Sequence, residues 1–182
     1  MIVAGLTGSI AMGKSETAKM LAARGIPVFD SDAAVHDMYA AGGEAVEPLR
    51  AVVPDAIGHD GVDRRKLASL VQADPALLKR IEAIVHPLVR ARQATFLADA
   101  ARHAELAVLD IPLLFETGRE KEVDVVIVVS ADAAQQRERA LARPGMTAEK
   151  LDFILSRQVP DVMKRARADY VIDTSVSLAD TA

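Results

Sequence analysis

The stretch Val3–Leu21, "VAGLTGSIAMGKSETAKML", decides the fold of this 182-residue chain. It begins with an apolar run of strand length and ends with an amphipathic run of helical character. Between the two runs, residues 8–15 match the pattern G-x-x-x-x-G-K-[ST]. A strand, a glycine-containing loop and a helix in this order bring main-chain N–H groups to a helix N-terminus, where they bind anions.

The loop therefore predicts a bound nucleoside triphosphate and Mg²⁺. Gly8 and Gly13 allow backbone turns that are closed to bulkier residues. The Lys14 ammonium is expected on the β and γ phosphates, and the Ser15 hydroxyl is the expected Mg²⁺ ligand. The other loop positions expected to contact the nucleotide are Ala11, Met12 and Glu16.

Five apolar runs of strand length recur along the chain: MIVAGLT, IPVFD, LAVLDIP, VDVVIVVS and DYVID. Near-continuous Val, Ile and Leu is typical of strands buried on both faces, and the first four runs are followed by helical periodicity. We predict an α/β fold with a parallel sheet flanked by helices. Its nucleotide-binding core is expected over 1–32, 104–143 and 160–182.

Two segments interrupt this core. Residues 33–103 read almost wholly as helix and are too long for a simple crossover. We expect them to form a subdomain over the edge of the sheet, at the carboxyl ends of the strands, where ligands of open α/β sheets bind. Asp74-Pro75 predicts a helix start, and His86-Pro87 predicts a boundary between two helices. Residues 144–159 have the size of a lid, and Thr147 is the expected cap of its helix.

Carboxylates follow two of the apolar runs. Asp30 and Asp32 point the same way in an extended chain, beside the phosphates if their strand neighbours the first one. A carboxylate there can take the proton of an attacking hydroxyl, although Asp32 could instead cap a helix beginning at Ala33. Asp110 ends the third run and is interpreted either as a water-mediated Mg²⁺ contact or as a capping or buried hydrogen-bonding group.

Arginines precede the expected lid. Arg139 and Arg143 lie four residues apart, which places them on one face of the helix leading into the lid. A closing lid would bring their positive charge to a transferring phosphoryl group while excluding water. Arg137 projects elsewhere and is expected to be solvated.

Composition and the distribution of apolar residues argue against several classes of function. A net charge of −4 and 3% aromatic residues argue against a nucleic-acid partner. No apolar run is long enough for a membrane span, and the N-terminus does not resemble a secretory signal, so a soluble, cytoplasmic protein is expected. The absence of cysteine excludes disulfides, thiolate zinc sites and a thiol nucleophile.

Seven stretches, taken together, resemble the dephospho-coenzyme A kinase family in the family's order. They are LTGSIAMGKS, VFDSDAAVHDMY, DGVDRRKLASLV, IVHPLV, LDIPLLFETG, QRERALARPGMT and KRARADYVID. The resemblance implies a P-loop kinase-type three-layer fold with a helical acceptor-binding insertion and a small helical lid. It also implies ATP- and Mg²⁺-dependent phosphorylation of the ribose 3′-hydroxyl of dephospho-CoA.

The resemblance assigns roles to particular residues. Asp32 falls on the proposed catalytic base, and the pattern Q-x-x-R-x-x-x-R gives Gln136, with Arg139 as the transition-state arginine and Arg143 at the start of the lid. Thr174 and Ser175 would lie near the adenine. The residues expected at the dephospho-CoA site are Asp30, Arg64, His86, Leu113, Phe115 and Glu116, with a helix-junction role left open for His86.

The loop departs from the usual family pattern at four positions. Ser9, Ala11, Met12 and Glu16 replace two glycines, the loop serine and the following threonine. Ala11 must hold φ below zero or accept strain, and Glu16 brings a carboxylate next to the Mg²⁺ serine. Two alternatives therefore remain beside the family function. One is a kinase for a nucleoside monophosphate or small metabolite, and the other is a degenerate nucleotide-binding protein without catalysis.

Overall fold

The computed structural model describes residues 1–181. The chain divides into two compact units. The first comprises Met1–Phe29 and the chain from Ala100 onward, and the second comprises Asp30–Asp99. The sequence predicted the insertion over 33–103, between segments of the core.

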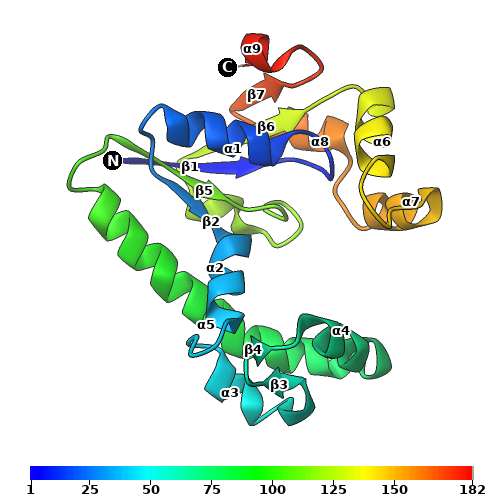
Figure 1. Cartoon of the computed structure of the whole chain (residues 1–182). Coiled ribbons are helices and arrows are strands. Elements are labelled where there is room, and N and C mark those ends of the chain that lie inside the picture. Colours follow the sequence, from blue (N-terminus) through cyan, green and yellow to red (C-terminus); the bar gives the residue numbers. More distant parts are fainter. Residues whose placement is uncertain (182) are drawn as a thin grey trace. The chain divides into compact units, whose positions relative to one another are not determined.

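The first unit is built on a parallel sheet (Figure 1). Its strands are β1 (Ile2–Thr7), β2 (Val28–Asp30), β5 (Leu106–Asp110), β6 (Val125–Ser130) and β7 (Tyr170–Asp173). They lie in the order β2-β5-β1-β6-β7, and β1 pairs in parallel with both β5 and β6, as β6 does with β7. The prediction of a parallel α/β sheet from the five apolar runs is confirmed. However, β2 neighbours β5 and not β1, so the adjacency considered for Asp30 and Asp32 is wrong.

The first unit also contains helices. They are α1 (Lys14–Ala23), α6 (Ala133–Leu141), α7 (Ala148–Ser156), α8 (Asp161–Ala166) and α9 (Leu178–Thr181), with a 3-10 turn η2 at Arg119–Glu122. Ala18 and Leu21 of α1 pack against a buried cluster of strand residues that includes Leu6 and Val108. This packing fixes α1 against the sheet, so the loop between β1 and α1 is held at both ends.

The second unit is mainly helical. Its elements are α2 (Ser31–Tyr39), α3 (Val46–Arg50), η1 (Pro54–Ala56), β3 (Ile57–Gly58), β4 (Gly61–Val62), α4 (Arg64–Ala73) and α5 (Pro75–Ala100). The antiparallel hairpin of β3 and β4 lies in the segment that the sequence predicted to be almost wholly helical. Helix α5 begins at Pro75 as predicted, and the Asp74 carboxylate accepts a hydrogen bond from the Ala76 N–H at 3.0 Å.

The predicted helix boundary at His86-Pro87 is wrong. Helix α5 is 26 residues long and continues without a break through Pro87. A proline inside a helix costs about 3 kcal/mol relative to alanine. Apolar side chains at four-residue spacing on both sides of the proline are buried, and each fully buried side chain of this kind contributes about 1.5–3 kcal/mol. They are Leu77, Ile81, Val85 and Val89. Their burial outweighs the proline penalty and keeps one helix.

Candidate functional site

The loop Gly8–Ser15, called the phosphate loop below, needs its two glycines for different reasons. A Cβ on Gly8 would lie 2.6 Å from the Val129 carbonyl oxygen, so close backbone approach excludes a side chain there. Gly13 is the N-cap of α1 and has φ of 92°, in the left-handed region. The first glycine lets the loop leave β1 beside β6, and the second turns it into the helix.

Several main-chain N–H groups of the phosphate loop remain available to a ligand. Within residues 1–181, those of Ala11, Gly13, Lys14 and Ser15 make no hydrogen bond. By contrast, the Ile10 N–H donates to the side chain of Gln158 at 3.1 Å. Because the first N–H groups of a helix have no partner inside the helix, this arrangement suits an anion.

Ala11 accepts backbone strain. Its φ of 61° makes it the sole non-glycine residue with positive φ among residues 1–181. Left-handed backbone costs an L-residue about 1–2 kcal/mol. The Ala11 side chain lies in a buried cluster with Ala140 of α6 and Leu151 of α7, and burial of one methyl returns about 0.8 kcal/mol. Of the two options that the sequence left for Ala11, the structure adopts the strained one.

Met12 fastens the phosphate loop to the ends of two strands. Its sulfur accepts a hydrogen bond from the Ala131 N–H just beyond β6, at 3.0 Å. Its carbonyl oxygen accepts one from the Thr174 hydroxyl just beyond β7, at 2.8 Å. Met12 and Thr174 are both buried. Although the sequence counted Met12 as a departure from the family pattern, the residue holds the loop in place.

Lys14 and Asp110 form an ion pair between the phosphate loop and the end of β5. Their side chains are only 16% and 5% exposed. Asp110 lies beside Leu6 in the register of β1 and β5, which places its carboxylate near the start of α1. The sequence predicted that Lys14 binds the phosphates, and it left Asp110 either as a water-mediated Mg²⁺ contact or as a capping or buried hydrogen-bonding group. The structure brings the two into direct contact, and Asp110 is buried.

Oxygen donors near this ion pair fit Mg²⁺. The Ser15 hydroxyl is exposed, and hydroxyl and carboxylate oxygens are the hard donors that Mg²⁺ prefers. Residues 1–181 contain no cluster of three or more His, Cys, Asp or Glu side chains that could hold a metal. Mg²⁺ usually keeps only one or two protein ligands and takes the others from phosphates and water. Ser15 and Asp110 therefore suit a metal that arrives with the nucleotide.

Glu16 lies on the exposed surface of α1. Its carboxylate is 2.7 Å from the Lys19 ammonium, and both side chains are more than half exposed. A carboxylate in the first turn also suits the helix dipole. The Lys19 ammonium offsets the negative charge that the sequence placed next to Ser15.

Arg139 is bound to the segment that follows β7. Its guanidinium donates to the Thr174 hydroxyl at 3.2 Å and to the Thr174 carbonyl at 2.8 Å. The placement of Arg139 and Arg143 on one helix is wrong, because α6 ends at Leu141. Arg143 precedes Pro144, and a residue before proline is disfavoured in helical conformation. Arg143 is exposed in the turn that leads to α7.

The segment Asp173–Ser175 is held by the start of α6. The Ser175 hydroxyl accepts from the Asp132 N–H at 2.9 Å, and the Ser175 carbonyl accepts from the Gln135 side chain at 2.9 Å. The N–H and hydroxyl of Ser175 lower the pKa of the Asp173 carboxyl. Thr174 and Ser175 are thus tied to α6, and Thr174 also to the phosphate loop.

Arg137 is not simply solvated as predicted. Its guanidinium lies 3.1 Å from the Asp152 carboxylate of α7. Both side chains are about half exposed, so the pair is worth little energy. It nevertheless links the helix before the lid to the lid helix, which Thr147 caps as predicted through the Lys150 N–H.

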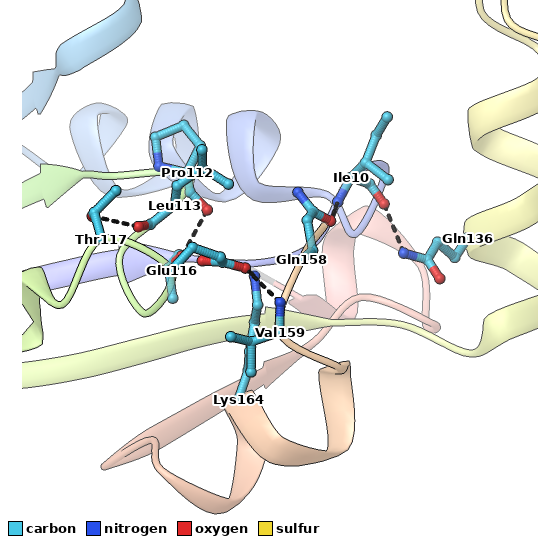
Figure 2. Close-up of polar contacts among 10 residues, drawn as sticks. Ile10, Pro112, Leu113, Glu116, Thr117, Gln136, Gln158, Val159 and Lys164 are labelled. Atoms are coloured by element: carbon cyan, nitrogen blue, oxygen red, sulfur yellow. Dashed lines mark hydrogen bonds and ion pairs between the residues drawn. The ribbon is translucent and has the colours of Figure 1, made fainter. Parts of the chain in front are cut away.

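Three of the residues predicted for the acceptor site, Leu113, Phe115 and Glu116, lie in the loop after β5 and differ in their exposure. Leu113 is 44% exposed, whereas Phe115 is buried with the Arg167 guanidinium 4.4 Å from its ring centroid. The Glu116 carboxylate contacts Lys164 of α8 and the Val159 N–H (Figure 2). Only Leu113 of the three presents an exposed side chain.

Asp30 and Asp32 have different environments at the start of α2. The Asp30 carboxylate caps the helix by accepting from the Ala33 N–H at 2.9 Å. The alternative in which Asp32 caps a helix beginning at Ala33 is therefore wrong, because the helix begins one residue before Asp32, at Ser31. Asp32 lies exposed in the first turn, and its carboxylate makes no hydrogen bond or ion pair within residues 1–181.

Two further predicted acceptor residues lie elsewhere in the second unit. Arg64 begins α4, which Asp63 caps. Burial raises the pKa of Tyr39, and the nearby Arg64 charge opposes this rise. His86 is exposed on α5, inside a continuous helix, so the helix-junction role that the sequence left open for it is wrong.

Gln158 and Lys164 were missed by the sequence analysis. Gln158 contacts the phosphate loop, and the Lys164 side chain is fully buried against Glu116. Neither residue lies in a pattern that predicts a partner, because both partners are more than forty positions away. Sequence spacing carries no signal for such contacts.

A parallel sheet whose first strand leads into this loop, with a lysine–aspartate pair beside N–H groups that are unpartnered within residues 1–181, defines a nucleotide-binding protein of the P-loop class. The family model described as Dephospho-CoA kinase matches residues 1–180, and the chain belongs to this family. The resemblance inferred from the seven stretches is confirmed.

Similar proteins cover nearly the whole chain. A relative from Rhizobium etli named dephospho-CoA kinase is 55% identical over 100% of this chain and 89% of its own length. One of the same name from Mesorhizobium japonicum is 56% identical, over 98% of this chain and 90% of its own. A crystal structure from Thermus thermophilus has 38% identity and a TM-score of 0.85, and the match covers 99% of this chain and 92% of that one. In residues 1–181, no helix has the length and apolar character needed to cross a membrane.

Proposed function

We propose that this kinase transfers the γ-phosphoryl group of ATP, with Mg²⁺, to the ribose 3′-hydroxyl of dephospho-CoA, the last step of coenzyme A formation. The observation that carries the proposal is the phosphate loop, whose N–H groups at Ala11, Gly13, Lys14 and Ser15 are unpartnered within residues 1–181. Membership of the family over 1–180 supports the identity of the acceptor.

Positively polarised groups would bind the phosphates of the donor, ATP. The N–H groups and the Lys14 ammonium would bind the β and γ phosphates, with Lys14 exchanging its contact with Asp110 for the phosphate oxygens. Bound Mg²⁺ would neutralise charge on these oxygens, with the Ser15 hydroxyl as its protein ligand and Asp110 in contact with it through water. Thr174 and Ser175 would border the adenine.

The proposed chemical step is an in-line displacement. The ribose 3′-oxygen attacks the γ-phosphorus, the bond from that phosphorus to the β–γ bridging oxygen breaks, and ADP leaves. The hydroxyl proton passes to the Asp32 carboxylate. That carboxylate is exposed and makes no hydrogen bond or ion pair within residues 1–181, which supports its assignment as base.

Cations would balance the charge that shifts during transfer. Arg139 is the arginine predicted for this task, but it must first leave its two contacts with Thr174. Arg143 is exposed and its side chain makes no ion pair within residues 1–181, so it can reach a ligand without breaking a contact. We propose that Arg143 acts together with Arg139. Arg64, His86 and Leu113 are the exposed candidates for binding the acceptor.

The experiment is a side-by-side kinase assay. The protein is incubated with ATP and Mg²⁺ and with dephospho-CoA, adenosine or AMP, and the products are identified by mass and by phosphorus NMR. The expected product is coenzyme A, in which the new phosphate is on the ribose 3′-oxygen. A higher kcat/KM with adenosine or AMP would defeat the assignment of the acceptor. Binding of dephospho-CoA without ATP binding in calorimetry would instead support the non-catalytic alternative.

A further inference from the structure

The connection between α7 and α8 is joined to two loops of the first unit (Figure 2). The Gln158 side-chain oxygen accepts the Ile10 N–H of the phosphate loop at 3.1 Å. The next residue, Val159, donates its N–H to the Glu116 carboxylate of the loop after β5 at 2.8 Å. Two consecutive residues that follow the lid helix therefore contact two separate loops.

The Ile10 residue is held from both sides. Its carbonyl oxygen accepts a hydrogen bond from the Gln136 side-chain amide at 2.9 Å. Gln136 belongs to α6 and is buried, whereas Gln158 follows α7. Figure 2 shows the two glutamines reaching Ile10 from separate segments. The Ile10 side chain also packs against the buried cluster of Ala11, Ala140 and Leu151.

Glu116, which accepts the Val159 N–H, is itself held in place by Lys164 of α8. Its carboxylate oxygen lies 2.9 Å from the Lys164 ammonium, and the Lys164 side chain is 0% exposed. A buried charge that loses its partner is strongly destabilising, so this pair holds α8 firmly against the loop after β5. The Asp161 carboxylate of α8 also accepts from the Ser130 hydroxyl at 2.7 Å. These contacts keep Gln158 at a fixed position next to the phosphate loop.

The side chains of Gln158 and Gln136 bond to the N–H and the carbonyl of Ile10. By contrast, the later loop N–H groups of Ala11, Gly13, Lys14 and Ser15 are unpartnered within residues 1–181. Holding Ile10 in one position orients those later N–H groups before a ligand arrives. Preorganisation of this kind raises affinity by lowering the ordering cost of binding. An isolated turn of this length would otherwise sample many conformations.

We propose that Gln158 is a positioning residue for the nucleotide: together with Gln136 it clamps Ile10 and so presets the phosphate loop for the triphosphate. The proposal rests on the ATP-dependent function proposed above. Because the clamp acts on the loop before chemistry begins, it contributes equally to the bound nucleotide and to the transition state. Its loss should therefore raise KM for ATP and leave kcat nearly unchanged.

The central variant is Gln158→Met, which keeps the length of the side chain and removes the amide oxygen. Gln158→Glu is the conservative variant, because a carboxylate still accepts the Ile10 N–H. Gln72→Met is the matched control, since Gln72 is exposed on α4 in the second unit. The first measurement is amide hydrogen exchange at Ile10 by NMR in the protein without nucleotide. The second is steady-state kinetics with ATP and dephospho-CoA, and the third is calorimetric ATP binding.

In Gln158→Met, we expect exchange at Ile10 to become about tenfold faster and KM for ATP to rise roughly 3- to 10-fold, as for one lost hydrogen bond. The kcat should stay within about twofold, KM for dephospho-CoA should not change, and Gln72→Met should match the wild type. Gln158→Glu should restore the slow exchange at Ile10. Gln136→Met, which removes the other half of the clamp, should raise KM for ATP in the same way.

Unchanged Ile10 exchange in Gln158→Met would overturn the proposal, as would unchanged KM for ATP in a variant that melts like the wild type. A fall in kcat at constant KM would also overturn it, because the contact would then act in the chemical step. If Gln158→Met does not fold, Gln136→Met decides by KM for ATP alone, because it removes the bond to the Ile10 carbonyl and leaves the Ile10 N–H bonded to Gln158. Failure of the proposed function is distinguishable: the wild type would then make no coenzyme A, while exchange and ATP calorimetry would still report on the clamp.

Discussion

The Lys14 ammonium of the phosphate loop lies against the Asp110 carboxylate at the end of β5, and both side chains are largely buried. In the absence of a nucleotide, each charge satisfies the other. Phosphate oxygens and Mg²⁺ offer replacement partners of the correct sign for both. The ion pair therefore keeps the site charge-balanced until a metal–nucleotide complex arrives.

Breaking this pair from one side should destabilise the protein. We expect Asp110→Asn alone to lower the free energy of unfolding by about 3 kcal/mol, because it leaves the largely buried Lys14 ammonium without its carboxylate partner. Lys14→Met removes the ammonium that offsets the Asp110 charge and should also be destabilising. The double variant should recover most of this loss, since neither charge remains. Urea denaturation of all four proteins without nucleotide measures the coupling. Additive losses in the double variant would contradict a direct pair.

Asp32 is predicted to be the catalytic base. Asp32→Asn should lower kcat by about a hundredfold or more, because positioned acid–base groups contribute about 10² to 10⁴. Calorimetric ATP binding should be unaffected. Asp37→Asn on the same helix is the control, since its exposed carboxylate lies 3.9 Å from Arg92 and such a pair is worth little. An unchanged kcat in Asp32→Asn would remove Asp32 from the chemistry.

Local features of the fold could be predicted from sequence because their causes are local. The strand, loop and helix around Gly8–Ser15 follow from hydrophobic periodicity and glycine placement within twenty residues. Thr147 and Asp74 were predicted as helix starts because a capping side chain bonds to N–H groups two or three residues away. Such interactions need no knowledge of the rest of the chain.

Features that depend on distant partners could not be predicted. Glu116 was assigned to the acceptor site, but its carboxylate contacts Lys164, 48 positions later. Pro87 was predicted to separate two helices, but buried apolar residues on both sides of it keep α5 as one helix. Likewise, no spacing rule places the Gln158 amide on Ile10. Tertiary packing decides each of these cases.

Ala11→Gly should change stability little, because its two effects nearly cancel. Removing the side chain relieves about 1–2 kcal/mol of left-handed strain. It also removes about 0.8 kcal/mol of stabilisation from the buried methyl group. In addition, glycine makes the unfolded chain more flexible, which costs about 0.4–1 kcal/mol more of folding free energy. We expect a net change within about 1 kcal/mol in urea denaturation. Ala11→Val should be clearly destabilising, because a β-branched residue is poorly tolerated at positive φ. Equal stability of the two variants would contradict the strain at Ala11.

Asp63 should make the stability of the protein depend on pH in the acid range. The Lys66 N–H, followed by the Arg65 N–H, lowers the pKa of this carboxyl, which caps α4. A pKa that is lower in the folded state stabilises fully above the unfolded value of about 4, and this contribution is lost as pH falls through the folded value. Asp63→Asn keeps a capping side chain without titration. The urea midpoint, followed by circular dichroism between about pH 6 and pH 3, should therefore fall more steeply in the wild type than in Asp63→Asn. Parallel curves for the two proteins would show that the Asp63 charge makes no contribution to the cap.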